Sequence, residues 1–252
     1  MNKTPDFLIG GVARSATTWL CRALDTHQQV YLPKPFTPEP KFFSRDKEYA
    51  KGMDYYCQKW FATAQDGLLR GEKSTSYLET SGCAERIHTH LPNVKLIFLL
   101  RDPVERAFSN YLWSKQNGLE SETFETALEL EQKREASLPE NLREARPYAY
   151  FARGLYAQLL EPFFNFFPHE RVLCLKMEDI GRDPNAFMQR LFVFLGLPPC
   201  GTDYSTLGIV NATPEELRKE AMSQTVRQHL YKAYEQPHQT LLALLGAGFT
   251  VW

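Results

Sequence analysis

The seven-residue run Val94–Leu100 constrains the fold of this 252-residue chain more than any other segment. Every residue in it except Lys95 is apolar, and the run is too short to span a membrane, so it is typical of a central strand in a parallel sheet. The segments Phe7–Ile9, Leu68–Tyr77 and Val172–Lys176 indicate further strands, and helical segments separate them. This alternation predicts an α/β fold with a mostly parallel central sheet flanked by helices.

Composition limits the classes of protein to consider. No repeat or low-complexity segment divides the chain, so we expect one domain over residues 1–252. Five irregularly spaced cysteines without a CxxC pair indicate reduced thiols rather than a disulfide framework or a zinc site. A formal net charge of -1 argues against a nucleic-acid partner. No signal peptide or membrane segment is apparent, which predicts a cytoplasmic location.

The first 20 residues predict a site for a phosphate-like anion. The apolar run Phe7–Ile9 breaks at Gly10 and Gly11 and continues as a helical pattern from about Ser15. A strand that turns through glycines into a helix leaves backbone N–H groups pointing out of the helix N-terminus. Those donors, the helix dipole and the cation of Arg14 favour a bound anion.

This loop departs from the Walker A pattern of nucleotide triphosphatases. Counted from Gly11, Ala16 and Thr17 stand where that pattern requires Gly and Lys, and the cation lies earlier, at Arg14. No strand ends in a clear magnesium-binding Asp, and His88 and His90 lie on different faces of a probable helix. We therefore expect no metal and regard a small nucleotide kinase as the less favoured alternative.

Two other strand ends carry groups suited to chemistry. Arg101 follows the central strand, where ligands bind in open α/β sheets, and Ser109 lies two turns into the next helix. Asp102 is a suitable N-cap for that helix. At another strand end, Glu72 and Lys73 place a carboxylate beside an ammonium, a pair suited to base and charge-stabilising roles.

Together these motifs resemble those of sulfotransferases that use 3′-phosphoadenosine 5′-phosphosulfate (PAPS). Arg14–Leu20 is similar to the family's [KR]-[SG]-[GA]-T-T-x-L loop, and Arg101–Ser109 to its R-D-P-x-x-R-x-x-S motif. Three further segments resemble the branch that contains heparan sulfate sulfotransferases and bacterial relatives, namely Glu39–Phe43, Lys51–Tyr56 and Gly71–Ser74. The resemblance covers roughly residues 5–200 and implies a sulfotransferase fold of the P-loop-kinase-like type.

The resemblance also implies roles for single residues. It places the 5′-phosphosulfate of PAPS, the co-substrate, on the opening loop and the 3′-phosphate on Arg101 and Ser109. It makes Glu72 the general base, with Lys73 and Arg14 stabilising charge on the transferred group. The loop residues expected to bind PAPS are Arg14, Ser15, Ala16, Thr17, Thr18 and Trp19.

Two departures from the family pattern and one gap affect the donor site. The family's usual loop Lys is Arg14 here, and its usual Gly is Ala16, which narrows the backbone angles open to the loop. The basic, glycine-rich loop that often closes over the adenine and 3′-phosphate is not evident, and only Arg218 and Lys219 are placed to replace it.

The acceptor is not readable from the motifs. A near-neutral chain favours a small-molecule natural product with a hydroxyl or amine over a long polyanionic glycan. We expect Lys41, Phe42 and Tyr77 to bind this acceptor, with residues 31–43 and 137–150 shaping its pocket. A degenerate nucleotide-binding protein without catalysis is the non-enzymatic alternative, and the oligomeric state is left open.

Overall fold

A computed structural model describes residues 3–208, 220–246 and 248–252. These residues divide into two compact units, Met1–Leu100 with Pro162–Asn211, and Arg101–Glu161 with Ala212–Trp252. Each unit is discontinuous in sequence, so no single cut of the chain separates them. The expectation of one domain over residues 1–252 therefore stays a prediction.

A five-stranded parallel sheet forms the centre of the first unit, as the sequence predicts. Its order is β2-β3-β1-β4-β5. The strands are β1 (Phe7–Gly11), β2 (Val30–Tyr31), β3 (Leu69–Lys73), β4 (Lys95–Leu100) and β5 (Val172–Lys176). The predicted central strand is β4, which is buried from Leu96 to Leu100 between β1 and β5.

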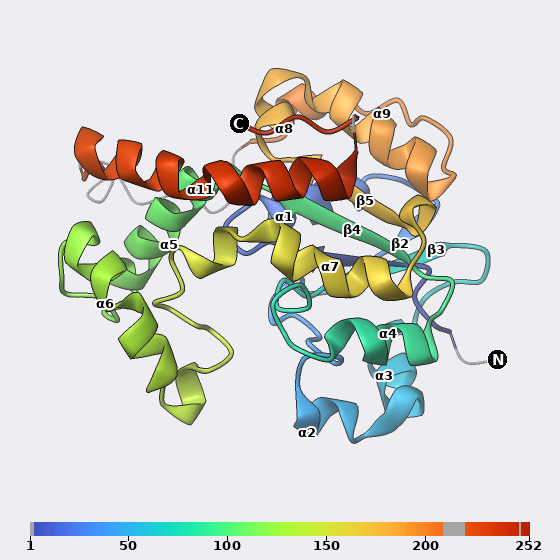
Figure 1. Cartoon of the computed structure of the whole chain (residues 1–252). Helices are drawn as coiled ribbons and strands as arrows, with labels where there is room; N and C mark the ends of the chain where they lie inside the picture. Colours follow the sequence, from blue (N-terminus) through green and yellow to red (C-terminus); the bar gives the residue numbers. More distant parts are fainter. Residues whose placement is uncertain (1–2, 209–219, 247) are drawn as a thin grey trace. The chain divides into compact units, whose positions relative to one another are not determined.

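Helices cover both faces of this sheet (Figure 1). On one face, α1 (Thr17–Leu24) and α9 (Pro184–Leu195) pack in a hydrophobic core with Ile9, Ile97 and Leu175 of the strands. On the other face, the ring of Phe98 meets Phe163 of α7 (Tyr156–Phe166) edge-on at 4.9 Å. The other helices of this unit are α2 (Asp46–Tyr49), α3 (Gly52–Phe61), α4 (Cys83–His90) and α8 (Glu178–Arg182).

The second unit is helical. It contains α5 (Pro103–Gln116), α6 (Phe124–Ala136), the short turn η2 (Ala152–Gly154) and α11 (Gln224–Leu245). Its core is a cluster of buried apolar side chains from α5, α6 and α11 around Tyr150. Within the described ranges, no helix is both long enough and apolar enough to cross a membrane. All five cysteines carry free thiols.

Candidate active site

The opening loop joins β1 to α1 through two left-handed residues. Arg14 has φ 70°, and Ala16, the residue before the helix, has φ 58° and ψ 23°. Non-glycine residues rarely adopt this conformation, because Cβ approaches the following carbonyl oxygen. The loop therefore holds, with an alanine, a backbone conformation that glycine adopts more readily.

A buried hydroxyl at the same place lacks a protein partner. Ser15 is fully buried, and its Oγ makes no hydrogen bond with the described residues. Buried polar groups are normally hydrogen-bonded, so this hydroxyl at the N-terminus of α1 has a hydrogen bond to offer to a bound molecule. Thr17 is buried and Thr18 is half-buried in the first turn of the helix. These residues fit a phosphate-like anion.

The predicted part of Trp19 in donor binding stays a prediction, and its side chain packs inside the first unit. Its indole is buried against Phe187 of α9, with ring centroids 6.1 Å apart, and its Nε1 donates to the carbonyl of Leu207 at 3.4 Å. The side chain belongs to the core below the loop, so only the backbone N–H of Trp19 is available to a donor molecule.

Lys73 connects the opening loop to a carboxylate. Its Nζ lies 3.4 Å from Thr18 Oγ1 and 3.1 Å from Glu39 Oε1. The Glu39 carboxylate also accepts hydrogen bonds from the backbone N–H and the hydroxyl of Thr75, at 2.9 and 3.0 Å. The Lys73 and Glu39 side chains are 6% and 13% exposed, so this ion pair is largely shielded from water.

Three hydroxyl groups surround the carboxylate of Glu72. Tyr56 and Tyr77 donate to its Oε1 at 3.0 and 2.5 Å, and Ser74 donates to its Oε2 at 2.9 Å. Burial raises the pKa of Glu72 to about 7, although these three hydrogen bonds act in the opposite direction. Ser74 Oγ in turn accepts from the backbone N–H of Lys41 at 2.8 Å, which ties Glu72 to the loop that carries Glu39.

Glu72 and Lys73 point to opposite faces of the sheet. Successive side chains alternate across a strand, and Lys73 pairs in register with Ile9, whose side chain faces the α1 and α9 core. Glu72 pairs with Leu8 and so faces the other side, where Tyr56 of α3 meets it. Both side chains nevertheless line one pocket, and their roles as base and charge-stabilising group stay predictions.

The residues predicted to bind the acceptor have different surroundings. Lys41 is half-buried and has φ 50°. Phe42 is buried and stacks on Tyr56 at 4.5 Å, and Tyr77 is buried with its hydroxyl on Glu72. Both side chains are buried, and their contact with the acceptor stays a prediction.

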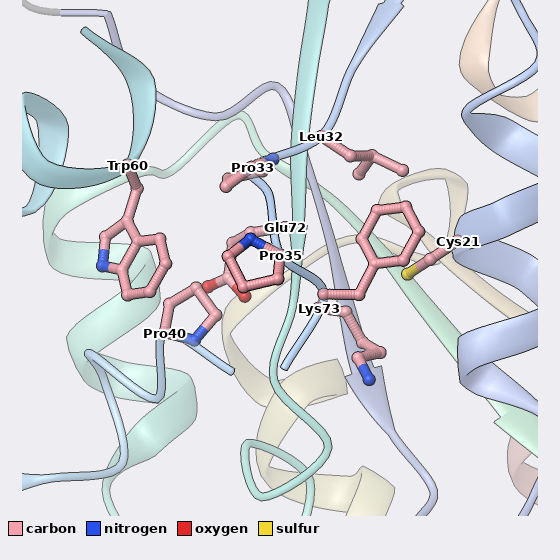
Figure 2. A pocket seen from close by; sticks show the side chains of 9 residues that line it. Cys21, Leu32, Pro33, Pro35, Pro40, Trp60, Glu72 and Lys73 are labelled. Carbon is pink, nitrogen blue, oxygen red and sulfur yellow. The ribbon is translucent and has the colours of Figure 1, made fainter. Parts of the chain in front are cut away.

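A pocket opens beside these groups within the first unit. It is small, with a free volume of about 10 Å³, which is room for about one water molecule. Figure 2 shows Trp60, Pro35 and Pro40 near the Glu72 carboxylate, while Lys73 points towards another side. Its nine lining residues are Cys21, Leu32, Pro33, Pro35, Phe36, Pro40, Trp60, Glu72 and Lys73.

The Arg101–Ser109 motif opens the second unit. Asp102 caps α5 as predicted, because its Oδ1 accepts from the backbone N–H groups of Val104 and Glu105 at 2.8 and 3.4 Å. Arg101 is half-buried, Ser109 is 8% exposed, and the carbonyl of Arg101 accepts from Tyr156 at 2.7 Å. Of the remaining predicted donor-binding residues, Arg218 and Lys219 lie outside the described residues.

Sequence reasoning gave no role to Glu39 or Tyr56. Glu39 lies in the segment Glu39–Phe43, which carries part of the family resemblance. This resemblance is the feature of the sequence that could have pointed to Glu39. Its pairing with Lys73, much further along the chain, depends on the tertiary fold. No cluster of three or more His, Cys, Asp or Glu side chains suited to a metal ion occurs in the part of the chain that is described.

Residues 4–236 match the family described as "Sulfotransferase domain", and the chain belongs to this family. Heparan sulfate glucosamine 3-O-sulfotransferase 3A1 of Mus musculus is 32% identical over 199 residues, which cover 79% of this chain and 47% of the mouse protein. The chain thus spans about half the length of that relative.

Solved structures give the same result for the fold. A sulfotransferase from Alicyclobacillus acidocaldarius matches with a TM-score of 0.78 and 26% identity over 96% of both chains. The mouse sulfotransferase SULT7A1, solved in complex with PAP, matches with a TM-score of 0.51 and 15% identity over 88% of this chain and 69% of that one. The predicted family and fold are therefore confirmed.

Proposed function

We propose that this protein transfers the sulfuryl group of PAPS to an acceptor hydroxyl or amine. The observation that carries the proposal is the buried Ser15 hydroxyl at the N-terminus of α1, which makes no hydrogen bond with the described residues, in a loop that resembles the family's donor loop. Arg14, Thr17, Thr18 and the backbone of Ala16 complete the set that would hold the 5′-phosphosulfate.

Arg101 and Ser109 are proposed to hold the 3′-phosphate. A guanidinium bonds two phosphate oxygens at once, and a helix hydroxyl adds a third contact. This second phosphate distinguishes the donor from ATP, and adenosine 3′,5′-bisphosphate (PAP) is the expected product. The PAP in the mouse SULT7A1 complex agrees with this choice of donor.

In the reaction, the acceptor oxygen or nitrogen forms a bond to sulfur while the bond from sulfur to the bridging phosphate oxygen breaks. The acceptor proton passes to a carboxylate, and PAP leaves with the electron pair of the broken bond. Lys73, next to Thr18 in the donor loop, is placed to stabilise negative charge on the bridging oxygen.

Glu39 is the carboxylate that the geometry favours as the base. It contacts Lys73, which in turn contacts the donor loop, and its side chain keeps 13% of its surface exposed. A base must come within hydrogen-bond reach of the proton that it removes. Both carboxylates have three polar partners, so the argument for Glu39 over Glu72 is its greater exposure, since Glu72 is only 1% exposed.

Glu72, the base predicted from the sequence, remains the second candidate. It lines the pocket, and its pKa of about 7 suits proton transfer near neutral pH. If it is not the base, it is a positioning residue that holds the Glu39–Phe43 loop through Ser74 and the Lys41 N–H.

Two isosteric variants separate these carboxylates. We expect Glu39→Gln to lower kcat by about 10²-fold or more with the Kd for PAP unchanged, as loss of a general base requires. Glu72→Gln should mainly raise the acceptor KM. The reverse result would assign the base to Glu72, and unchanged turnover in both variants would remove carboxylate base catalysis altogether.

Two alternatives from the sequence are tested by the same measurements. A small nucleotide kinase would bind ATP in preference to PAPS and require magnesium. A non-catalytic nucleotide-binding protein would bind PAP without transfer to any acceptor. A cytoplasmic location and a part in natural-product biosynthesis stay predictions from the sequence.

A further inference from the structure

Thr75 holds the carboxylate of Glu39 with two groups at once. Its backbone N–H donates to Oε2 at 2.9 Å, and its hydroxyl lies 3.0 Å from Oε2 and 3.2 Å from Oε1. Rotation about the last side-chain bond of a glutamate is intrinsically soft, so contacts with neighbours decide which way the two oxygens point. For Glu39 these contacts come mainly from Thr75, in the turn after β3.

The contacts of Glu39 make its two oxygens unequal. A carboxylate has about four acceptor sites, two on each oxygen. The N–H and the hydroxyl of Thr75 both reach Oε2, whereas Oε1 receives the ammonium of Lys73 at 3.1 Å. Counted over the contacts of the described residues, Oε1 keeps one site for a further donor. Oε1 is also the oxygen on the side of the donor loop, because Lys73 bonds Thr18 at 3.4 Å.

The turn that carries Thr75 is fixed to the end of β1, from which the donor loop starts. The backbone N–H of Ser74 donates to the carbonyl of Ile9 at 3.0 Å, and that of Leu78 donates to the carbonyl of Gly10 at 2.9 Å. The contact between the turn and the carboxylate therefore sets the orientation of the carboxylate relative to the donor loop. A general base acts only within hydrogen-bond reach of the proton that it removes, so this orientation affects the rate.

We propose that Thr75 is a positioning residue for sulfuryl transfer. It anchors Oε2 of Glu39 and thereby turns Oε1 towards the acceptor, whose proton passes to Oε1 as its oxygen or nitrogen bonds to sulfur. The inference rests on the proposed role of Glu39 as the base, and it adds the residue that orients this base and the oxygen that takes the proton. Thr75 acts through Glu39, so its removal should change turnover and not donor binding.

Two substitutions at Thr75 separate its hydroxyl from its bulk. Thr75→Val keeps the shape and the backbone N–H but removes the hydroxyl, and we expect it to lower kcat by about tenfold, as misplacement of a reacting group does. The Kd for PAP and the acceptor KM should stay unchanged. Thr75→Ser restores the hydroxyl and should recover most of the lost kcat. If Thr75→Val does not fold, Thr75→Ala takes its place.

Thr80→Val is the matched control. Thr80 is half-buried a few residues after Thr75, and its hydroxyl donates to the carbonyl of Ser76 at 2.8 Å. The control therefore loses one hydroxyl hydrogen bond in the same segment, away from Glu39, and should keep the wild-type kcat.

A double variant separates positioning from a merely structural role. If Thr75 acts only through Glu39, adding Thr75→Val to Glu39→Gln should lower kcat no further. A structural role would lower kcat by the same factor in both backgrounds. Initial rates are measured with PAPS and the fastest acceptor among 2-naphthol, benzyl alcohol and glucosamine, and PAP affinity is measured by calorimetry.

The outcomes separate the inference from the proposed function. A lower kcat in Thr75→Val, recovery in Thr75→Ser and no further loss in the double variant support the inference. Wild-type kcat in Thr75→Val beside a slow Glu39→Gln overturns the inference alone, as does an equal loss in both backgrounds. Wild-type kcat in Glu39→Gln overturns the proposed base and the inference together, and absence of PAP binding overturns the proposed function.

A second measurement needs no turnover. Crystal structures of the wild type and Thr75→Val with PAP should show the Glu39 carboxylate rotated in the variant, with its contact to Lys73 lost. The same orientation in both structures overturns the inference, whichever acceptors the protein uses.

Discussion

Ala16 is the residue where local backbone chemistry departs most from the family pattern. Its left-handed conformation costs a non-glycine residue about 1 kcal/mol or more, whereas glycine adopts it freely. We expect Ala16→Gly to raise the free energy of unfolding by up to about 1 kcal/mol, after the entropy gained by the unfolded chain is subtracted. Urea unfolding measures this change.

Ala62→Gly is the matched control, because Ala62 is exposed and right-handed, with φ -56° at the end of α3. There the same substitution should lower the free energy of unfolding by about 0.5–1 kcal/mol. If Ala16→Gly and Ala62→Gly lower the free energy of unfolding equally, the left-handed conformation of Ala16 has no energetic cost.

Glu72 makes the stability of the fold depend on pH. Its pKa is about 7 in the folded chain and 4.5 as a model value, so the folded state keeps a proton that the unfolded state releases between these values. The free energy of unfolding should fall as pH rises from about 4.5 to about 7, by about 3 kcal/mol at most from this group.

Glu72→Gln removes this titration. The stability of the variant relative to the wild type should therefore increase between pH 5 and pH 8, measured by denaturant unfolding at each pH. Glu85→Gln on α4 controls for the loss of an exposed carboxylate. A stability difference between Glu72→Gln and the wild type that does not change with pH would contradict the raised pKa.

At the scale of elements, the N-cap residue Asp102 stabilises helix α5. Asp102 accepts from two backbone N–H groups, and its other oxygen accepts from Tyr231 at 2.8 Å. We expect Asp102→Ala to lower the free energy of unfolding by about 1–2 kcal/mol, while Asp102→Asn keeps the cap and loses less. Thermal unfolding of both variants measures these losses. If Asp102→Ala and Asp102→Asn lower the free energy of unfolding equally, the cap contributes little to stability.

Elements with a strong local signal were predictable from the sequence. The predicted strand Val172–Lys176 has the bounds of β5, and the predicted strand Val94–Leu100 agrees with β4 to within one residue, since both are mostly apolar runs. The two-residue strand β2 was not among the predicted strands, because it is a strand only through pairing with Leu69 and Arg70 of β3. Local propensity carries no signal for such pairing.

At the scale of the whole molecule, the sequence predicted the family and the parallel sheet but not the partners inside the site. The Glu39–Lys73 pair and the hydroxyl shell of Glu72 join segments that the fold brings together. Strand geometry requires the side chains of Glu72 and Lys73 to point to opposite faces of the sheet. Which face each one takes is known only from their pairing with Leu8 and Ile9 of β1. The sequence motif pointed to the two residues, and the structure shows towards which face of the sheet each of their side chains points.

Donor binding should stabilise the whole chain. A ligand that binds only the folded state adds about 2.7 kcal/mol at 100 times its Kd, so PAP should raise the melting temperature with concentration. Adenosine monophosphate should stabilise less, because it lacks the second phosphate. Arg101→Ala should remove most of the advantage of PAP over adenosine monophosphate. An unchanged advantage in Arg101→Ala would contradict the proposed role of Arg101.

The most direct test is transfer of labelled sulfate from PAPS, with EDTA present, to a panel of acceptor alcohols, phenols and amines by this protein. The account predicts labelled sulfated acceptor and an equal amount of PAP, both strongly reduced in Glu39→Gln, which still binds PAP. Failure of the wild-type protein to bind PAP and to release label to any acceptor would contradict it.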